Sequence, residues 1–187
     1  MQTTERTAII LPTGTWDVDP AHSVVEFSVR HLMVSKVKGR FGRFAGTITV
    51  GHEPSEAAVE ATIDVSSVDT GDPARDAHLR SAEFLDVEAH PTATFASRAV
   101  RAAGDGYVVT GDLSLHGVTR PVELRLDYNG AGPDAWGGTR AGFSATTELN
   151  RRDFGVDISM PLANGGAVVG DKITINLEIQ AVARPAA

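Results

Sequence analysis

The sequence predicts an all-β fold, a single antiparallel β-barrel of about eight strands with one short capping helix. Apolar and polar residues alternate with a period of two along most of the chain, as they do in strands with one buried face. The 19 glycines and 9 prolines supply frequent turns. A single short segment carries helix-capping residues. A chain of 187 residues suits one domain.

The alternation defines seven segments, which in chain order are residues 25–29, 59–65, 92–100, 107–115, 122–128, 143–149 and 173–179. An eighth strand is expected over Gly39–Val50, where glycines at 39, 42 and 46 accompany Phe41 and Phe44. Glycine inside a strand marks a bend, a bulge or a close approach of the backbone. Turn residues separate the strands at 104–106, 129–130, 137–138 and 165–166.

The one predicted helix follows Asp72-Pro73, an N-cap acceptor before a proline at the first helical position. It continues to Arg80, with Asp76 and Arg80 four residues apart and able to pair. So short a helix needs tertiary contacts, so we expect it to cover an open end of the sheet. Strands with one apolar face form either a barrel or a sandwich. The strand with repeated glycines and the single helix favour the barrel. The interior of such a barrel is filled by side chains or holds one small ligand.

Composition excludes several classes of function. With 17 basic and 24 acidic residues the formal net charge is −7, which disfavours nucleic-acid binding. The absence of cysteine excludes thiol chemistry and disulfides. No apolar run approaches the roughly 20 residues of a membrane-spanning helix. Residues 1–6 show no signal-peptide pattern, so a cytoplasmic protein is expected. We expect residues 1–13 to form a flexible segment and residues 14–184 the barrel.

No sequence motif points to catalysis. The six histidines show neither the spacing of a zinc protease nor an H-x-H pair, and no G-x-S-x-G nucleophile motif occurs. We therefore expect no catalytic residue, metal or cofactor. Two alternatives stay open: an enzyme that uses His22, His31 or His78 together with Arg151, and a haem or metal site assembled from distant histidines.

One basic stretch stands out in this acidic chain. No acid occurs between Glu26 and Glu53, a segment that contains Arg30, Lys36, Lys38, Arg40 and Arg43. These charges either pair with acids on neighbouring strands or form a positive rim for an anionic group. The seven phenylalanines, in turn, either fill the core or line an apolar cavity.

The motifs in order resemble the YceI-like family of lipocalin-like proteins. The resemblance rests on W-x-V-D-P-x-H-S from Trp16, F-x-V-x-H from Phe27, G-x-F-x-x-F-x-G from Gly39, R-x-x-H-L-x-S-x-x-F-L-D-V from Arg75, P-x-x-x-F from Pro91, G-x-L-x-x-x-G-V-T from Gly111, R-x-D-F-G from Arg151 and V-G-D from Val169. It covers residues 14–179.

The resemblance implies an extended barrel with a helical cap that binds a long isoprenoid lipid and is not known for catalysis. Many members are exported to the periplasm. The expected function is non-catalytic binding, storage or transport of an isoprenoid lipid or quinone. The alternative is sequestration of a lipophilic small molecule such as an antibiotic. A homodimer is expected by analogy with the family.

The expected ligand site has two parts. The cavity residues are Phe27, Val29, Met33, Phe41, Phe44, Phe84, Phe95, Leu113, Phe143 and Phe154. The residues expected at a head-group rim are His31, Lys38, Arg40 and Arg151.

Overall fold

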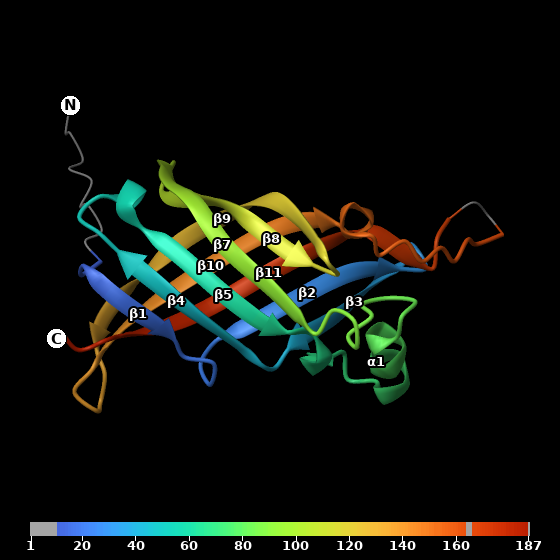
Figure 1. Cartoon of the computed structure of the whole chain (residues 1–187), viewed down its shortest axis with the longest axis horizontal. Coiled ribbons are helices and arrows are strands. Elements are labelled where there is room, and N and C mark those ends of the chain that lie inside the picture. Colours follow the sequence, from blue (N-terminus) through green and yellow to red (C-terminus); the bar gives the residue numbers. More distant parts are fainter. Residues whose placement is uncertain (1–10, 164–165, 187) are drawn as a thin grey trace.

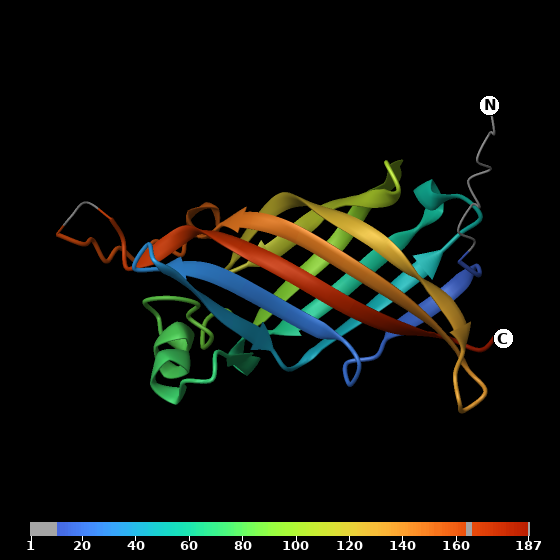
Figure 2. The same cartoon turned by 180° about the vertical axis from the view of Figure 1, so that it is seen from behind.

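A computed structural model describes residues 11–163 and 166–186, so residues 1–10 of the segment predicted to be flexible lie outside the described residues. The chain forms an elongated barrel (Figure 1). β1 and the C-terminus lie at one end, called here the terminal end, and the helix α1 lies at the other, called the helix end (Figure 1, Figure 2). No helix among the described residues is long and apolar enough to cross a membrane.

The described residues form eleven strands and four short helices. The strands are β1 (Gly14–Val18), β2 (Val24–His31), β3 (Ser35–Phe41), β4 (Phe44–Val50), β5 (Ala58–Asp64), β6 (Val68–Asp69), β7 (Thr92–Ala103), β8 (Gly106–Leu115), β9 (Val118–Pro133), β10 (Thr139–Asn150) and β11 (Val169–Ala183). The helices are η1 (Pro54–Glu56), η2 (Val65–Ser67), α1 (Pro73–Arg80) and η3 (Arg151–Phe154).

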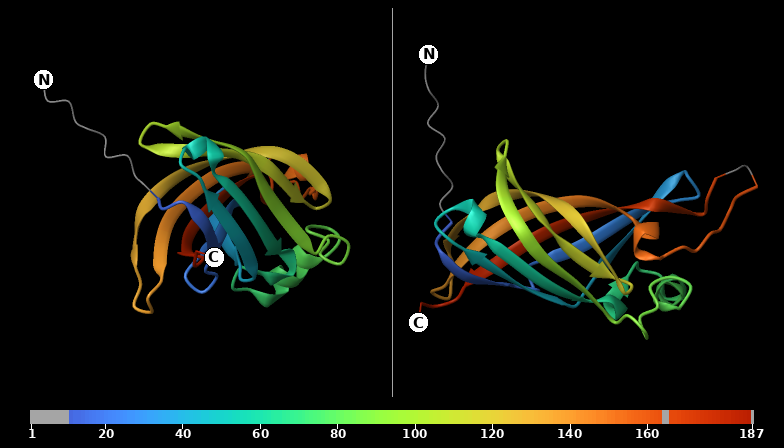
Figure 3. Two further views of the ribbon diagram at one scale, coloured as in Figure 1. Left: turned by 60° about the vertical axis from the view of Figure 1, so that its left-hand side comes forward. Right: turned by 45° about the horizontal axis from the view of Figure 1, so that its top comes forward.

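The strands close into an antiparallel barrel, as predicted. The ring runs β1-β4-β5-β7-β8-β9-β10-β11 and closes through pairing of β1 with β11. At 15 residues, β11 is long enough to serve two partners. Its C-terminal part pairs with β1, and Val169–Glu178 pairs with β2. The strands β2, β3 and β6 thereby extend the wall toward the helix end (Figure 3).

Two predictions about glycine were wrong. Gly39–Val50 is not one bent strand, because the chain turns at Gly42-Arg43 and β3 and β4 join different neighbours. Asn129-Gly130 is not a turn between strands, because β9 continues to Pro133. The register between β9 and β10 shifts at this point, and Gly130 has a φ of 117°. These features identify a β-bulge. Glycine suits the backbone conformation of a bulge as well as that of a turn, so the same residues fit both.

The predicted helix is present, with its cap. The Asp72 side chain accepts hydrogen bonds from the amides of Ala74 (3.0 Å) and Arg75 (3.1 Å). The expected Asp76–Arg80 pair does not form. Asp76 is buried and accepts hydrogen bonds from the amide and hydroxyl of Thr70, whereas Arg80 donates to backbone carbonyls of the segment before the helix. Both side chains therefore attach α1 to the segment that precedes it, whose strand β6 pairs with β3.

The terminal end is filled by side chains. Trp16 is 1% exposed and packs with Ala141, Phe143 and Ala181. Its indole Nε1 donates to the carbonyl of Pro12 at 3.2 Å. A second buried cluster contains Phe95, Val100 and Val109.

Candidate functional site

An apolar cavity of about 300 Å³ extends along the interior of the barrel, within the usual range for small-molecule sites. Its walls come from all eight strands of the ring and from β2 and β3. On β11 the lining residues alternate as predicted, from Ile173 through Ile175 and Leu177 to Ile179. At about 3.3 Å per residue these positions alone span roughly 20 Å. The cavity is therefore long and suits an extended chain.

Polar groups are sparse in this cavity. Among the described residues that line it, the polar side chains are Glu60, Thr147 and Arg151, and Glu60 itself is exposed. The wall offers a ligand almost nothing but aliphatic and aromatic surface. Binding inside it would thus be driven by burial of apolar area rather than by hydrogen bonds.

Two strand glycines let aromatic rings lie flat against the wall. A Cβ at Gly111 would lie 2.5 Å from Cζ of Phe95, and a Cβ at Gly39 would overlap the ring of Phe27. Both rings line the cavity. The close approach that the sequence suggested at Gly39 therefore has a specific purpose: it makes room for an aromatic side chain.

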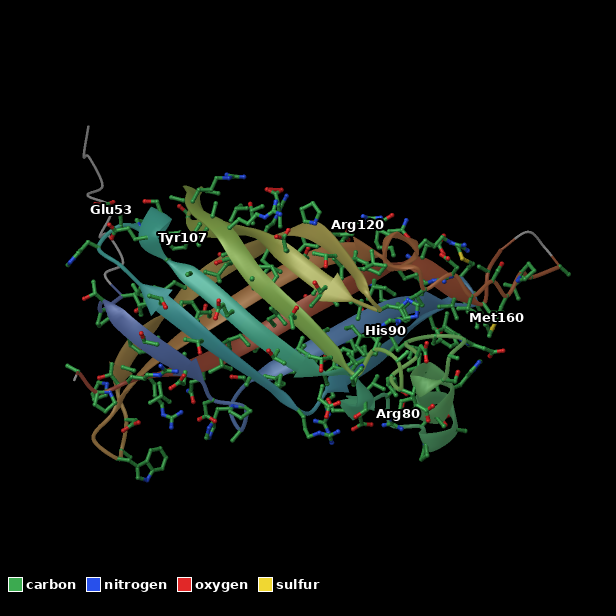
Figure 4. The ribbon with its side chains drawn as sticks, in the orientation of Figure 1. Glu53, Arg80, His90, Tyr107, Arg120 and Met160 are labelled. Atoms are coloured by element: carbon green, nitrogen blue, oxygen red, sulfur yellow. The ribbon has the colours of Figure 1, made fainter. Side chains whose placement is uncertain are left out.

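A second cavity of about 340 Å³ lies at the helix end and is called here the mouth. It shares Phe27, Val29, Leu79, Phe84 and Val169 with the first cavity, so the two are adjacent. Its other lining residues are Arg30, His31, Val37, Thr70, Ala74, Arg75, His78, Met160 and Val168. Two arginines and two histidines thus line the opening, namely Arg30 and His31 on β2 and Arg75 and His78 on α1. Figure 4 places Met160 at this end of the barrel.

Nine of the ten predicted cavity residues line the apolar cavity, and their role in ligand binding stays a prediction. Every one except Met33 lines the apolar cavity, namely Phe27, Val29, Phe41, Phe44, Phe84, Phe95, Leu113, Phe143 and Phe154. The prediction for Met33 was wrong. Met33 lies in the turn between β2 and β3 with a φ of 63° and is 53% exposed, because alternation ends where the strand ends.

The prediction that Lys38 and Arg40 lie at the rim of the cavity was also wrong. On β3 the cavity and the mouth are lined by Phe41 and Val37, and the basic residues occupy the opposite, outer phase. Lys38 Nζ lies 3.2 Å from Glu26 Oε1, and Arg40 Nη2 lies 3.4 Å from Asp69 Oδ2. Both side chains are more than two-thirds exposed, at 69% and 68%. Lys38 and Arg40 therefore compensate acids on the neighbouring strands.

The same outer surface continues at Arg43, whose Nη2 lies 2.7 Å from Asp64 Oδ2. Hydrogen bonds from Ser66, and then from Arg43, lower the pKa of Asp64. These contacts are made around the turn that separates β3 from β4, away from the lining of both cavities.

The other two predicted rim residues do face the ligand space. His31 lines the mouth and Arg151 lines the apolar cavity. Arg151 is 7% exposed, and its guanidinium donates to the carbonyls of Gly170 (3.0 Å) and Val156 (2.6 Å). Its Nη2 also lies 2.9 Å from Asp171 Oδ1. Burial lowers the pKa of Arg151, and Asp171 opposes this change. The hydrogen bond to Gly170 and the ion pair with Asp171 join η3 to β11.

The histidines of the enzymatic alternative lie in different places. His22 pairs with Asp19 at 2.8 Å and lines neither cavity. His31 and His78 both line the mouth, where His78 Nε2 lies 2.5 Å from Glu83 Oε2. Sequence reasoning did not place Thr70 and Arg75 at the ligand opening, whereas Arg30 belonged to the basic stretch that was expected as a possible positive rim. The motif from Arg75 to His78 was the available signal for Arg75, since it sets the two residues about one turn apart on α1.

Comparison with known proteins agrees with this architecture. A model of the YceI-like domain matches residues 16–181. A UPF0312 protein of Pseudomonas aeruginosa is 44% identical over 145 residues, which cover 77% of this chain and 76% of that protein. A UPF0312 protein of Pectobacterium atrosepticum is 45% identical over 142 residues, covering 75% and 74% of the two chains.

Two solved structures share the fold. Burkholderia cenocepacia BcnA matches with a TM-score of 0.75 at 24% identity, over 87% of this chain and 98% of that one. A polyisoprenoid binding domain from Saccharophagus degradans, implicated in plant cell wall breakdown, matches with a TM-score of 0.69 at 18% identity, over 90% and 98%. The lipocalin-like barrel is thus the shared framework.

Proposed function

Because the chain belongs to the YceI-like family and its barrel encloses a long apolar cavity, we propose that it binds and carries an isoprenoid lipid or quinone without catalysing a reaction. The observation that carries the proposal is the continuous apolar lining over roughly 20 Å of β11. A linear hydrocarbon chain suits such a space better than a compact polar metabolite does. The polyisoprenoid binding neighbour supports the choice of ligand class.

The energetics favour a carrier over a one-way trap. Burial of ten methylene equivalents at about 0.8 kcal/mol each supplies roughly 8 kcal/mol, which corresponds to micromolar affinity from water. Transfer from a bilayer gains little, because lipid tails are as apolar as the cavity. The chain would therefore exchange its ligand readily with a membrane, and the head group would decide selectivity.

We place the head group in the mouth. Arg30, His31, Arg75 and His78 line it and offer hydrogen-bond donors next to the apolar cavity. Arg75 already donates to the hydroxyl (2.7 Å) and carbonyl (3.0 Å) of Thr70, which holds its guanidinium at the opening. Such a lining favours a head group that accepts hydrogen bonds, such as a quinone carbonyl or a phosphate oxygen.

The direct test is organic extraction of the purified full chain followed by mass spectrometry. We expect a co-purifying polyprenyl chain or quinone. A cavity that is empty, together with no uptake of such lipids from vesicles, would contradict the proposal and favour sequestration of another lipophilic molecule.

A pair of matched variants separates the cavity from the rest of the barrel. Ala145 is 8% exposed and lines the cavity, whereas the adjacent Thr146 faces outward. Ala145→Phe is expected to abolish lipid retention by filling the space, at a stability cost of about 1–3 kcal/mol. Thr146→Phe places the same ring on the outside and is expected to retain the lipid. Circular dichroism verifies that both variants fold.

A further inference from the structure

Three side chains of types that can bind a metal lie close together at the helix end, outside the lining of both cavities. Asp86 and His90 belong to the loop between α1 and β7, and His116 lies in the turn between β8 and β9. One ligand atom from each residue lies within 4.8 Å of the other two. The rings of His90 and His116 are 5.0 Å apart between centroids. Figure 4 places His90 at the end of the barrel near α1.

Two of the three residues have left-handed backbone conformations. Asp86 and His116 are two of the few non-glycine residues with positive φ, at 46° and 53°. The carbonyl of Asp86 accepts hydrogen bonds from the amides of Ala89 (3.1 Å) and His90 (2.8 Å), which curls the loop so that the carboxylate and the imidazole share one side. The positive φ of His116 belongs to the two-residue turn that it forms with Gly117, and this turn holds its ring beside the loop after α1.

The orientation of His116 is fixed as it is in metal ligands. Its Nδ1 lies 3.0 Å from the carbonyl oxygen of Phe154. A carbonyl oxygen can only accept, so Nδ1 carries the hydrogen and Nε2 keeps a free lone pair. Histidines that bind metals almost always donate their other ring N–H to such an acceptor, which sets both the tautomer and the ring direction.

From this geometry we propose that Asp86, His90 and His116 bind one divalent transition-metal ion of the zinc class. Two imidazole nitrogens and one carboxylate oxygen suit Zn²⁺, whereas Mg²⁺ and Ca²⁺ prefer oxygen ligands alone. Ligand atoms about 2.0–2.2 Å from a tetrahedral ion lie roughly 3.3–3.6 Å from one another. The three ligand atoms would therefore move closer together by about an ångström when the ion binds. Three protein ligands leave one position for water.

The ion would act as a clamp on the helix end of the barrel. Two of the three ligands adjoin residues that line the apolar cavity: Leu85 precedes Asp86, Leu115 precedes His116, and the carbonyl of Phe154 accepts the hydrogen bond from His116. Metal binding would therefore tie together the loop after α1, the β8–β9 turn and η3. The three ligands lie outside both cavities, so the ion would bind whichever lipid the barrel carries.

The test is titration of the tag-free full chain with Zn²⁺, followed by calorimetry and by competition with a chromogenic chelator. One ion per chain is expected. Substitution with Co²⁺ supplies a spectroscopic signature, since tetrahedral coordination gives intense visible absorption. The loaded protein should also unfold at a higher temperature, because binding to the folded state stabilises it.

Four variants decide the outcome. His90→Ala, Asp86→Asn and His116→Asn each remove one ligand, and asparagine tolerates the positive φ of the last two positions. Each should weaken Zn²⁺ binding at least about tenfold, because loss of a residue that only orients a metal ligand already weakens metal binding by roughly 10–100-fold. His52→Ala removes an exposed histidine elsewhere and should bind Zn²⁺ like the wild type.

The metal-free melting temperature of each variant shows whether it folds. If the wild type does not bind Zn²⁺, or if the folded ligand variants bind it as tightly as His52→Ala does, the proposal is overturned. Loss of the Co²⁺ band and of the zinc-dependent thermal shift in the ligand variants alone would support it.

Discussion

The two ends of the barrel are closed by different kinds of contact. At the terminal end, Trp16 and its apolar neighbours fill the interior, and the cavity stops short of the indole ring. At the helix end the closure consists of α1, η3 and the loop after α1, with the mouth lined by arginines and histidines beside them. The terminal end is closed by a packed core, whereas the helix end is closed by α1, η3 and the loop after α1, called here the cover.

The attachment of the cover shows the same difference. α1 is held mainly by polar contacts: Arg80 donates to the carbonyls of Ser66 (2.8 Å) and Val68 (2.7 Å), and Asp76 accepts from Thr70. Leu79 is its residue in the apolar cavity. Water can replace hydrogen bonds of this kind at little net free energy, whereas exposure of a tryptophan core is costly. We therefore expect ligand exchange through the helix end.

The largest expected effect is at the terminal end. Trp16→Ala should lower the free energy of unfolding by about 3–5 kcal/mol because it removes the largest buried side chain there. For a chain of this size that corresponds to a drop of roughly 6–20 °C in melting temperature. Trp136→Ala is the matched control, since Trp136 is 79% exposed and should change stability little. Equal losses for both tryptophans would contradict a packed terminal end.

The next effect concerns Arg151 at the helix end. Arg151→Met leaves the buried carbonyls of Gly170 and Val156 without their donor, and should destabilise the chain by about 2–3 kcal/mol. Arg152→Met is the control. Arg152 pairs with the same Asp171 but is 43% exposed, so its loss should cost less than about 1 kcal/mol. Denaturant unfolding measures both, and a larger loss for Arg152 would show that η3 is anchored differently.

A smaller, pH-dependent effect is expected near the terminal end. Arg140, and secondarily His22, lower the pKa of Asp19 from 3.8 to about 2 by hydrogen bonding its carboxylate. The resulting stability is present above about pH 4 and is lost as the pH falls through about 2. Asp19→Asn should therefore cost about 1–2 kcal/mol at pH 7, after allowance for partial exposure. The cost should shrink toward zero near pH 2, as acid denaturation curves would show.

The smallest effect is expected on the outer surface of β3. Lys38→Glu and Arg40→Glu each break an exposed ion pair, and each should cost less than about 1 kcal/mol. Affinity for a neutral quinone and for an isoprenoid pyrophosphate should stay the same, because neither side chain lines a cavity. If the pyrophosphate ligand alone binds more weakly to the double variant, the outer face takes part in head-group recognition.

The sequence by itself determined which face of each strand is buried. Alternation placed Phe27, Phe95 and Phe143 on the inner phase, and each lines the cavity. It also determined the capped helix, because Asp72 supplies the N-cap acceptor and Pro73 suits the first helical position. Such patterns concern neighbours along the chain, so they can be predicted without knowing the partner strands.

Only the tertiary structure decided what lies across the barrel. It divided Gly39–Val50 into two strands with different neighbours, gave Lys38 and Arg40 their acidic partners, and placed His31 and His78 in one mouth. It likewise brought His116 beside Asp86 and His90, 26 positions after the second of these. These contacts depend on strand order, register and loop path, which are set by pairing between distant segments and leave no periodic trace in the sequence.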